Sequence, residues 1–435
     1  MTDKATVGFY TLGCKVSQYE SEAIAEEFER QGFTVCDSAL PCDFYVINTC
    51  TVTAEGDRKS RQIIRRLKRN NPEAKVLVCG CYSQRSPDEV FSMPEVDAVI
   101  GTEGKMKLPE IARSLKAGER FISVGDLSDK TFEPMSIRSA PRTRVYVKIE
   151  DGCESRCAYC AIPSARGAVR SKPREAVIEE IRALCESGVR EIVLTGIETG
   201  SYGKDFDNEY RLADLICELD RLGFPERIRL GSLAPELVGQ DFADKIKGVK
   251  RLAPHFHISI QSGSDRVLRL MRRRYTRARL IENINRLREY FPKAQFTTDL
   301  MVGFPGESEE DFLESMSIVD EAGLYDAHVF AYSKRHGTDA EGFDGQIDET
   351  TKRERSERLI AKVKQRKREV LTRIFEAGEE LSCIFETKLK DGSFSGHSDS
   401  FIEVEGLPTD LDLRGEIRNC IPFGIKNESL IVDIV

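Results

Sequence analysis

Three cysteines lie close together in the stretch Cys153-Glu154-Ser155-Arg156-Cys157-Ala158-Tyr159-Cys160, with three and then two residues between them. This spacing lets one short loop direct three sulfurs toward a common centre. Three thiolates leave the fourth iron of a cubane cluster without a protein ligand, so that iron can bind a substrate or cofactor. A zinc knuckle and buried structural thiols are the alternatives. Because a structural zinc site has four ligands and no fourth Cys or His lies close by, the spacing favours an iron–sulfur cluster.

Three further cysteines each follow a predicted strand in the first part of the chain. Residues 7–12, 45–47 and 75–78 are apolar, and Cys14, Cys50 and Cys81 come just after them. Predicted helices alternate with these strands, which indicates an open parallel α/β domain over residues 1–127. Sites in such sheets form at the carboxyl ends of the strands, so the three thiols can meet at one edge. The alternative is that they are ordinary core cysteines.

Two local expectations concern the same domain. Cys79 is expected to pack within its strand, because the following Gly80 favours a turn and sets Cys81 apart. Ser17 is expected to cap the first helix, with Glu20 three residues later completing a capping box.

The rest of the chain divides into three segments. Residues 128–143 are polar and read as a linker. In residues 144–373 strands and helices alternate again, and loops rich in glycine or polar residues follow the strands. This pattern predicts a full or partial parallel barrel with its site at the carboxyl ends of the strands. Residues 374–435 carry short alternating strands and turns, which predict a small β-barrel. His255, His257 and His328 are expected in the core or behind the site rather than as metal ligands.

Composition narrows the classes of protein. The chain has 435 residues, 13 cysteines and a net charge of -8, and it has no apolar run long enough to span a membrane. We expect a cytoplasmic protein whose cysteines are reduced thiols or metal ligands rather than a disulfide framework. Basic residues gather in residues 58–69, 266–279 and 352–373. Together they suggest a phosphate-binding surface, although each alone is more simply a solvated helix face.

The residues around the first motif narrow its meaning. Asp151-Gly152 before the loop, and residues 162–167 after it, resemble the methylthiotransferase branch of the radical S-adenosylmethionine (radical SAM) enzymes. The sequences around Cys14, Cys50 and Cys81 match the family's N-terminal motifs. The resemblance implies a radical SAM 4Fe–4S cluster on Cys153, Cys157 and Cys160, and an auxiliary 4Fe–4S cluster on the other three cysteines. It also implies a partial six-unit barrel and a C-terminal TRAM domain, a module that binds tRNA.

The resemblance also implies a set of residues that contact S-adenosylmethionine. Glu198 is expected to bind the ammonium group of the methionyl part of S-adenosylmethionine. Arg272 is expected to contact its carboxylate or a phosphate. Tyr159 could cover the cluster or stack on adenine. The remaining contacts are expected in the loops after the strands, at Gln261, Ser262, Gly303 and Gly306. Taken individually, the glycine-rich turns could equally be plain tight turns.

The implied reaction replaces hydrogen at C2 of a tRNA adenosine with a methylthio group. Residues 11–20 and 332–335 resemble the enzymes that act on N6-threonylcarbamoyladenosine at position 37, beside the anticodon. The partners would be the tRNA anticodon stem-loop, an external electron donor and a sulfur donor. The alternatives are an enzyme acting on N6-isopentenyladenosine, one acting on an aspartate of a ribosomal protein, and a non-catalytic iron–sulfur sensor that binds RNA. Residues 374–435 carry thirteen acids against five bases, so the C-terminal barrel cannot bind RNA by phosphate neutralisation alone.

Overall fold

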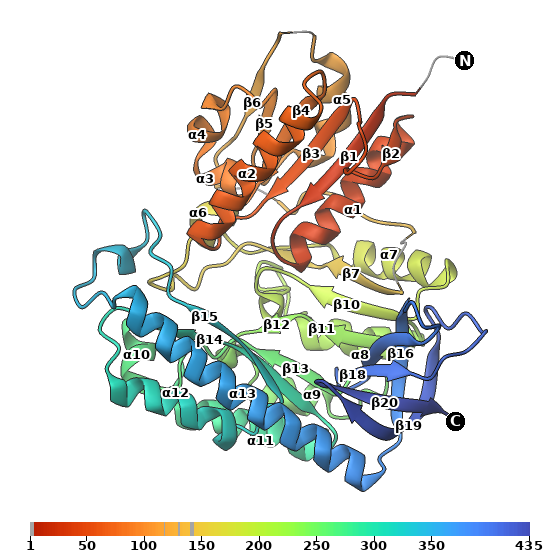
Figure 1. Ribbon diagram of the computed structural model, residues 1–435, viewed down its shortest axis with the longest axis vertical. Coiled ribbons are helices and arrows are strands. Elements are labelled where there is room, and N and C mark those ends of the chain that lie inside the picture. The colour runs from red at the N-terminus through yellow and green to blue at the C-terminus, as the bar shows by residue number, and fades with distance from the viewer. Residues whose placement is uncertain (1–3, 117, 129–130, 140–142) are drawn as a thin grey trace. The chain divides into compact units, whose positions relative to one another are not determined.

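The computed structural model describes residues 4–116, 118–128, 131–139 and 143–435 (Figure 1). They form two compact units. Unit 1 comprises Met1–Ile137, Lys148–Lys172 and Ser333–Glu341, and unit 2 comprises Arg138–Val147, Pro173–Tyr332 and Gly342–Val435. The predicted linker and the predicted central segment therefore each contribute residues to both units.

Unit 1 is built on a six-stranded parallel sheet with the strand order β2-β1-β3-β4-β5-β6 (Figure 1). This confirms the predicted open parallel α/β fold. The sequence pattern missed the two edge strands, β2 and β6, which are short and much less buried than the central strands. The strands are β1 (Thr6–Thr11), β2 (Thr34–Cys36), β3 (Phe44–Thr49), β4 (Lys75–Gly80), β5 (Ala98–Ile100) and β6 (Phe121–Ser123).

Helices cover both faces of this sheet, because successive side chains of its buried strands point to opposite sides. On one face Tyr45 and Ile47 of β3 share a core with Ile64 of α2. On the other, Val46 packs with Ile24 of α1. The helices of unit 1 are α1 (Lys15–Arg30), α2 (Ala54–Asn70), α3 (Cys81–Arg85), α4 (Pro87–Ser92), α5 (Leu108–Ser114), α6 (Ile162–Arg166) and the 3-10 turn η1 (Lys105–Lys107). A short ribbon pairs β8 (Glu150–Asp151) with β9 (Arg170–Ser171).

The predicted start of the first helix is wrong. Helix α1 begins at Lys15, and its N-cap residue Cys14 makes no side-chain cap. Ser17 lies inside the first turn, where its carbonyl accepts a hydrogen bond of 3.0 Å from Asn48 Nδ2. Glu20 is fully buried and takes part in a charge cluster described below. Contacts of Ser17 and Glu20 with distant residues therefore replace the capping box that the local sequence predicts.

The expectation of reduced thiols is wrong for one pair of cysteines. Cys36, at the end of β2, and Cys42, before β3, form a disulfide. Gly8 of β1 makes room for it, since a Cβ at this position would lie 3.1 Å from Cys42 Sγ.

Unit 2 contains two sheets with the parallel pairs expected of a partial βα barrel. One has the order β11-β10-β7 and the other β12-β13-β14-β15. The strands are β7 (Arg144–Lys148), β10 (Glu191–Thr195), β11 (Arg227–Leu230), β12 (Ser232–Leu233), β13 (His255–Ile258), β14 (Gln295–Val302) and β15 (Asp326–Ala331). The main helices are α7 (Arg174–Glu186), α8 (Leu212–Leu222), α9 (Gln240–Ile246), α10 (Asp265–Leu270), α11 (Arg277–Tyr290), α12 (Glu309–Glu321) and α13 (Glu349–Ala377).

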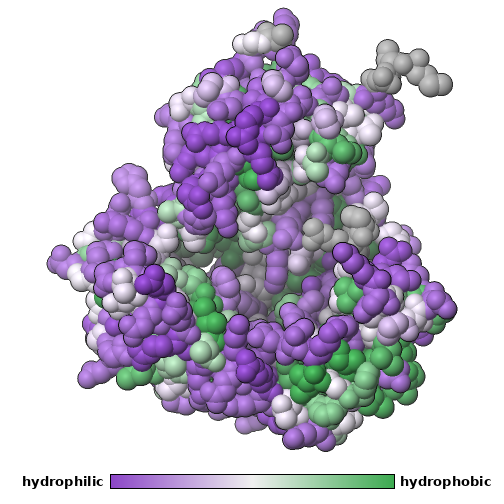
Figure 2. Space-filling view, in the orientation of Figure 1, coloured by the Kyte–Doolittle hydropathy of each residue, from purple (hydrophilic) through white to green (hydrophobic). Residues whose placement is uncertain are grey.

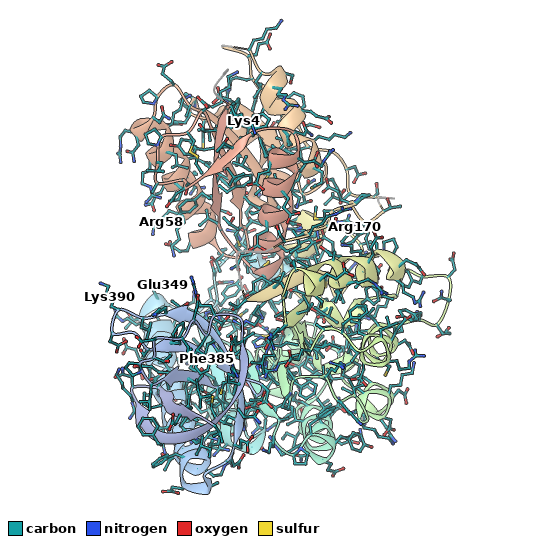
Figure 3. The ribbon with its side chains drawn as sticks, turned by 90° about the vertical axis from the view of Figure 1, so that its right-hand side faces the viewer. Lys4, Arg58, Arg170, Glu349, Phe385 and Lys390 are labelled. Atoms are coloured by element: carbon teal, nitrogen blue, oxygen red, sulfur yellow. A yellow bond between two sulfur atoms is a disulfide. The ribbon has the colours of Figure 1, made fainter. Side chains whose placement is uncertain are left out.

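The end of unit 2 is a closed barrel of five strands with the order β16-β17-β18-β20-β19, which confirms the predicted small β-barrel. Phe385 and Phe394 fill its core (Figure 3). Its outer surface is partly apolar, because Ile421, Phe423 and Ile425 alternate along one face of β19 and are exposed (Figure 2). The strands are β16 (Leu381–Lys388), β17 (Phe394–Ser398), β18 (Glu403–Gly406), β19 (Ile417–Lys426) and β20 (Ser429–Ile434).

Among the residues described, no helix is both long and apolar enough to cross a membrane.

Candidate functional site

The loop that carries Cys153, Cys157 and Cys160 belongs to unit 1 and is irregular, between β8 and α6. Backbone amides point at its sulfurs: Ser155 N lies 3.5 Å from Cys153 Sγ, and Ile162 N lies 3.4 Å from Cys160 Sγ. Amides directed at thiolate sulfur are typical of iron–sulfur sites. The three thiols are partly exposed, as an iron open to a cofactor requires. The donor set and its amides therefore fit a cluster of this kind.

Cys14, Cys50 and Cys81 follow β1, β3 and β4, three strands that are neighbours in the sheet. A Cβ at Gly13, next to Cys14, would lie 3.4 Å from Cys50 Sγ, and the charges of Cys14 and Cys81 act on Cys50. Among the described residues, no group of three or more Cys, His, Asp or Glu side chains is arranged to hold a single metal ion. Burial raises the pKa of the Cys50 thiol to about 11, and the nearby Cys81 and Cys14 add to this rise. A cation or metal would therefore favour the thiolate form of Cys50.

Cys79 stays within β4, as predicted. It is fully buried in an apolar core, and burial raises the pKa of its thiol to about 12. Gly80 then has a φ of +100°, and a Cβ there would lie 2.5 Å from Asn48 Oδ1. No other residue fits this turn. The turn directs the chain out of the strand, so Cys81 starts α3.

A buried charge cluster lies beside these cysteines in unit 1. Glu20 of α1 is fully buried, and its carboxylate lies 2.6 Å from Lys105 Nζ, 2.8 Å from Lys148 Nζ and 2.5 Å from Arg166 Nη1. Burial alone would raise the pKa of Glu20, but Arg166, Lys105 and Lys148 together hold it well below its ordinary value. Asp151 extends the cluster, because it lies 2.6 Å from Lys148 Nζ and 3.1 Å from Arg166 Nη1.

Sequence reasoning missed this cluster. Its members come from positions 20, 105, 148, 151 and 166, and no pattern in the sequence connects them. The only available signal was that Asp151 and Arg166 flank the three-cysteine loop.

Glu198 lies in unit 2 just after β10, at the carboxyl ends of the parallel strands. Its Oε1 accepts a hydrogen bond of 3.0 Å from Ala234 N. Burial raises the pKa of this carboxyl to about 7, while Arg273 and the Ala234 amide oppose the rise. A carboxyl with this pKa in a strand-end loop is suited to hold a cationic group.

Two neighbouring arginines, Arg272 and Arg273, differ in exposure. Arg272 is exposed and adopts a φ of +59°. The next residue, Arg273, is largely buried and lies 3.7 Å from Glu236, and it is the arginine whose charge acts on Glu198. The sequence singled out a stretch of arginines but could not tell which one faces inward.

The remaining expected contacts lie in the loops after β13 and β14. Gln261 has a φ of +69°, and its backbone N–H donates to the backbone carbonyl of Asp299 at 2.8 Å. Ser262 is fully buried, with its Oγ 3.3 Å from Ser315 Oγ of α12, so its hydroxyl serves the packing of the loop. Gly303 and Gly306 have φ values of +71° and +80°. The last expected contact, Tyr159, lies in unit 1, in the loop that carries the three cysteines.

Three histidines lie on β13 and β15, on either side of Asp299 of β14. His257 Nε2 lies 3.2 Å from Asp299 Oδ2, and His328 Nδ1 lies 3.5 Å from Asp299 Oδ1. His255 is buried and His257 partly so, as expected. The side chain of His328 is 75% exposed, so its placement in the core is wrong. Asp299 raises the pKa of His328.

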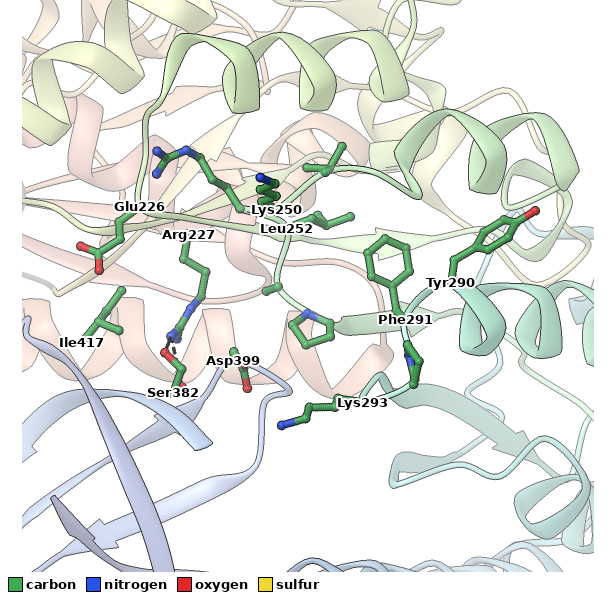
Figure 4. A pocket seen from close by; sticks show the side chains of 15 residues that line it. Glu226, Arg227, Lys250, Leu252, Tyr290, Phe291, Lys293, Ser382, Asp399 and Ile417 are labelled. Atoms are coloured by element: carbon green, nitrogen blue, oxygen red, sulfur yellow. Dashed lines mark hydrogen bonds between the residues drawn. The ribbon is translucent and has the colours of Figure 1, made fainter. Parts of the chain in front are cut away.

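A hollow of about 430 Å³ lies at the opposite edge of the strands of unit 2 (Figure 4). Arg227 at the start of β11 crosses it and donates to Ser382 Oγ at 2.7 Å. Since this hollow faces the amino ends of the strands, it does not include Glu198 or the strand-end loops.

The basic stretches differ in how much of their charge is free. In α13 Lys352, Arg355 and Lys367 are buried and each contacts an acid. Helix α2 instead presents its charge to solvent, and hydrophilic residues cover it in Figure 2. Arg58 pairs with the neighbouring Glu55 and lies at the surface (Figure 3). Arg65 and Arg69 are exposed. In the stretch 266–279, Arg269, Arg272 and Arg274 are exposed as well. Helix α2 is therefore one candidate for a phosphate-binding surface.

Comparison with known proteins decides the family. The chain is 40% identical over 421 residues to "Threonylcarbamoyladenosine tRNA methylthiotransferase MtaB" of Bacillus subtilis, covering 95% of this chain and 92% of the relative. The chain belongs to the radical SAM tRNA methylthiotransferase family. The Thermotoga maritima protein of the same name is 37% identical over 401 residues, covering 92% of this chain and 91% of that one.

Other members of the family carry a different name. The "tRNA-2-methylthio-N(6)-dimethylallyladenosine synthase" of Natranaerobius thermophilus is 33% identical over 362 residues, covering 81% of this chain and 80% of the relative. The radical SAM superfamily profile matches residues 147–319, and the profile described as uncharacterized protein family UPF0004 matches residues 6–101.

The fold of the methylthiotransferase is shared with a solved enzyme. The radical S-adenosylmethionine methyltransferase TsrM from Kitasatospora setae superimposes with a TM-score of 0.55 at 16% identity, covering 75% of each chain. Membership in the radical SAM superfamily implies a 4Fe–4S cluster and S-adenosylmethionine as cofactors.

Proposed function

We propose that this methylthiotransferase converts N6-threonylcarbamoyladenosine at position 37 of tRNA to its 2-methylthio derivative. The observation that carries the proposal is the similarity over nearly the whole chain to two proteins named for this substrate, at 40% and 37% identity. The relatives named for dimethylallyladenosine are less similar, at 30% to 34% identity.

Two sets of cysteines would hold the cofactors. Cys153, Cys157 and Cys160 would bind the radical SAM 4Fe–4S cluster, and Cys14, Cys50 and Cys81 an auxiliary 4Fe–4S cluster. When bound, the first cluster supplies the electron that cleaves S-adenosylmethionine, and the second holds the sulfur to be transferred. C2 of adenine is neither acidic nor nucleophilic, which is why the reaction needs this chemistry. The electron and the sulfur would come from external donors.

The chain's own residues would bind and orient the reactants. The amides of Ser155 and Ile162 hold the cysteine sulfurs of the loop. Glu198, at the carboxyl ends of the strands, would accept the ammonium of S-adenosylmethionine. Tyr159, Gln261, Arg272, Gly303 and Gly306 remain proposed contacts of the same cofactor, and the burial of Ser262 against α12 favours a supporting role for it.

The tRNA would bind through its phosphates and an unstacked base. Exposed arginines of α2 would contact the anticodon stem-loop, whose phosphates favour clustered guanidinium groups. A base in the anticodon loop can be turned outward without melting a helix. Because tRNA is the substrate, we place the reaction in the cytoplasm.

The test is a reaction with purified, cluster-reconstituted enzyme on two anticodon stem-loops, one with N6-threonylcarbamoyladenosine and one with N6-isopentenyladenosine. Nucleoside mass spectrometry is expected to show a methylthio group on the first only. Cys81→Ala is expected to abolish the product, whereas Cys79→Ala retains it. Modification of the isopentenyl substrate alone would contradict the proposed substrate, and equal loss from both variants would contradict the proposed ligand.

A further inference from the structure

Arg166 connects the two proposed cluster sites of unit 1. It is the last residue of α6, which directly follows the three-cysteine loop, and its side chain is fully buried. Its Nε–H donates to Cys81 Sγ at 3.1 Å. This is a short distance for a hydrogen bond to sulfur, and the donor carries a positive charge.

The other side of the same guanidinium group is fixed by two carboxylates. Nη1 lies 2.5 Å from Glu20 Oε1 and 3.1 Å from Asp151 Oδ2, and Nη2 lies 3.2 Å from Glu20 Oε2. A planar fork held by two acids cannot turn its Nε–H away from Cys81 without breaking these bonds. Its direction toward the sulfur is therefore set by the fold.

The backbone around Arg166 also supports the three-cysteine loop. Cys153 N donates to the carbonyl of Gly167 at 3.0 Å, and a Cβ at Gly152 would lie 1.9 Å from the carbonyl oxygen of Ala168. The segment that carries Arg166 thus packs directly against the start of the loop. One short segment anchors Cys153 through its backbone and Cys81 through its side chain.

We propose that Arg166 is a positioning residue for the auxiliary cluster: its Nε–H bond holds Cys81 Sγ in place and raises the reduction potential of the cluster bound there. This inference rests on the proposed auxiliary cluster at Cys14, Cys50 and Cys81. Reduction adds negative charge to a cluster, and hydrogen bonds to its sulfurs stabilise that charge, so a lost bond lowers the potential.

A full-length protein that can hold only the auxiliary cluster gives the cleanest test. Replacing Cys153, Cys157 and Cys160 with Ala creates this parent. Arg166→Lys is then added, which keeps the positive charge but not the Nε–H bond. The matched control is Arg170→Lys, because Arg170, which is labelled in Figure 3, is also buried and contacts Asp151 at 3.5 Å. Iron content is measured, and the midpoint potential is obtained by redox titration followed by electron paramagnetic resonance.

The parent is expected to bind about four irons per chain. Arg166→Lys is expected to shift the midpoint potential to a more negative value, whereas Arg170→Lys leaves it where it is in the parent. Equal potentials in the parent and Arg166→Lys would overturn the inference while leaving the auxiliary cluster in place. A parent without iron would overturn the auxiliary cluster itself, and the inference with it.

A second variant decides the case in which Arg166→Lys holds no iron. Glu20→Gln combined with Arg166→Met removes one acid and one base together. A folded double variant, by circular dichroism, that fails to bind iron supports the positioning role of Arg166. A double variant that binds four irons at the parent's potential overturns it.

Discussion

Replacing Glu20 with Gln is expected to destabilise unit 1 strongly. The substitution preserves the shape of the side chain but removes a negative charge that faces Lys105, Lys148 and Arg166. Lys148 and Arg166 keep Asp151 as an acid partner. Lys105 is fully buried and loses the ion pair of 2.6 Å that it makes with Glu20.

Leaving a buried charge without its partner costs about 3–5 kcal/mol of unfolding free energy. For a unit of this size, about 2–4 °C of Tm corresponds to each kcal/mol, so the expected fall is roughly 10 °C. Adding Lys105→Met to Glu20→Gln removes the orphaned charge and is expected to recover part of this loss.

The assay is thermal and urea unfolding of the cluster-free protein, followed by circular dichroism. Glu55→Gln is the control, since Glu55 pairs with Arg58 at the surface and an exposed pair contributes little. The pKa of Glu20 is depressed in the folded protein. The difference between wild type and Glu20→Gln is therefore fully present above the ordinary pKa of 4.5 and shrinks as the pH falls below it. An unfolding midpoint of Glu20→Gln equal to that of the control would refute the reasoning.

Three further predictions concern the cofactors and the RNA. Cys157→Ala is expected to lower iron content by about four per chain and to abolish cleavage of S-adenosylmethionine, while Cys185→Ala, a half-buried thiol of α7, changes neither. Binding of S-adenosylmethionine, measured by calorimetry, is expected to tighten as the pH rises through about 7, because Glu198 then ionises, and Glu198→Gln is expected to remove this dependence. Replacing Arg65 and Arg69 with Glu is expected to weaken tRNA binding and to reduce the salt slope by about 1 for each lost phosphate contact, and an unchanged slope would exclude α2 from the RNA surface.

The alternation of strands and helices was enough to predict the sheet of unit 1 and the parallel strands of unit 2, and the short strands and turns of residues 374–435 were enough to predict the closed barrel. It also predicted that Cys14, Cys50 and Cys81 follow strands of one parallel sheet, and these strands are neighbours, so the three cysteines share one edge. Gly80 also predicted that Cys81 leaves the strand whereas Cys79 stays within it, because the positive φ at position 80 requires glycine and turns the chain.

What the sequence could not predict depends on contacts between distant positions. Glu20 looked like half of a capping box, yet its partners lie at positions 105, 148 and 166. The arginine whose charge acts on Glu198 is Arg273, whereas Arg272 is exposed. The Cys36–Cys42 disulfide depends on how the loop before β3 returns to β2. In each case packing, rather than local pattern, decides the direction of a side chain.

The C-terminal barrel is an acidic module whose exposed surface includes Ile421, Phe423 and Ile425 of β19. Phosphate neutralisation is a poor explanation for RNA binding by such a surface. Aromatic stacking and loop shape remain available to it, and Phe423 is half exposed.

The central claim is that this methylthiotransferase modifies N6-threonylcarbamoyladenosine in tRNA. It is tested most directly by mass spectrometry of tRNA nucleosides from host cells with the gene, without it, and with the Cys81→Ala variant. We expect the 2-methylthio derivative to disappear in the last two, with a matching rise in unmodified N6-threonylcarbamoyladenosine and no change in isopentenyladenosine derivatives. An undiminished 2-methylthio-N6-threonylcarbamoyladenosine content in cells that lack the gene would contradict the claim.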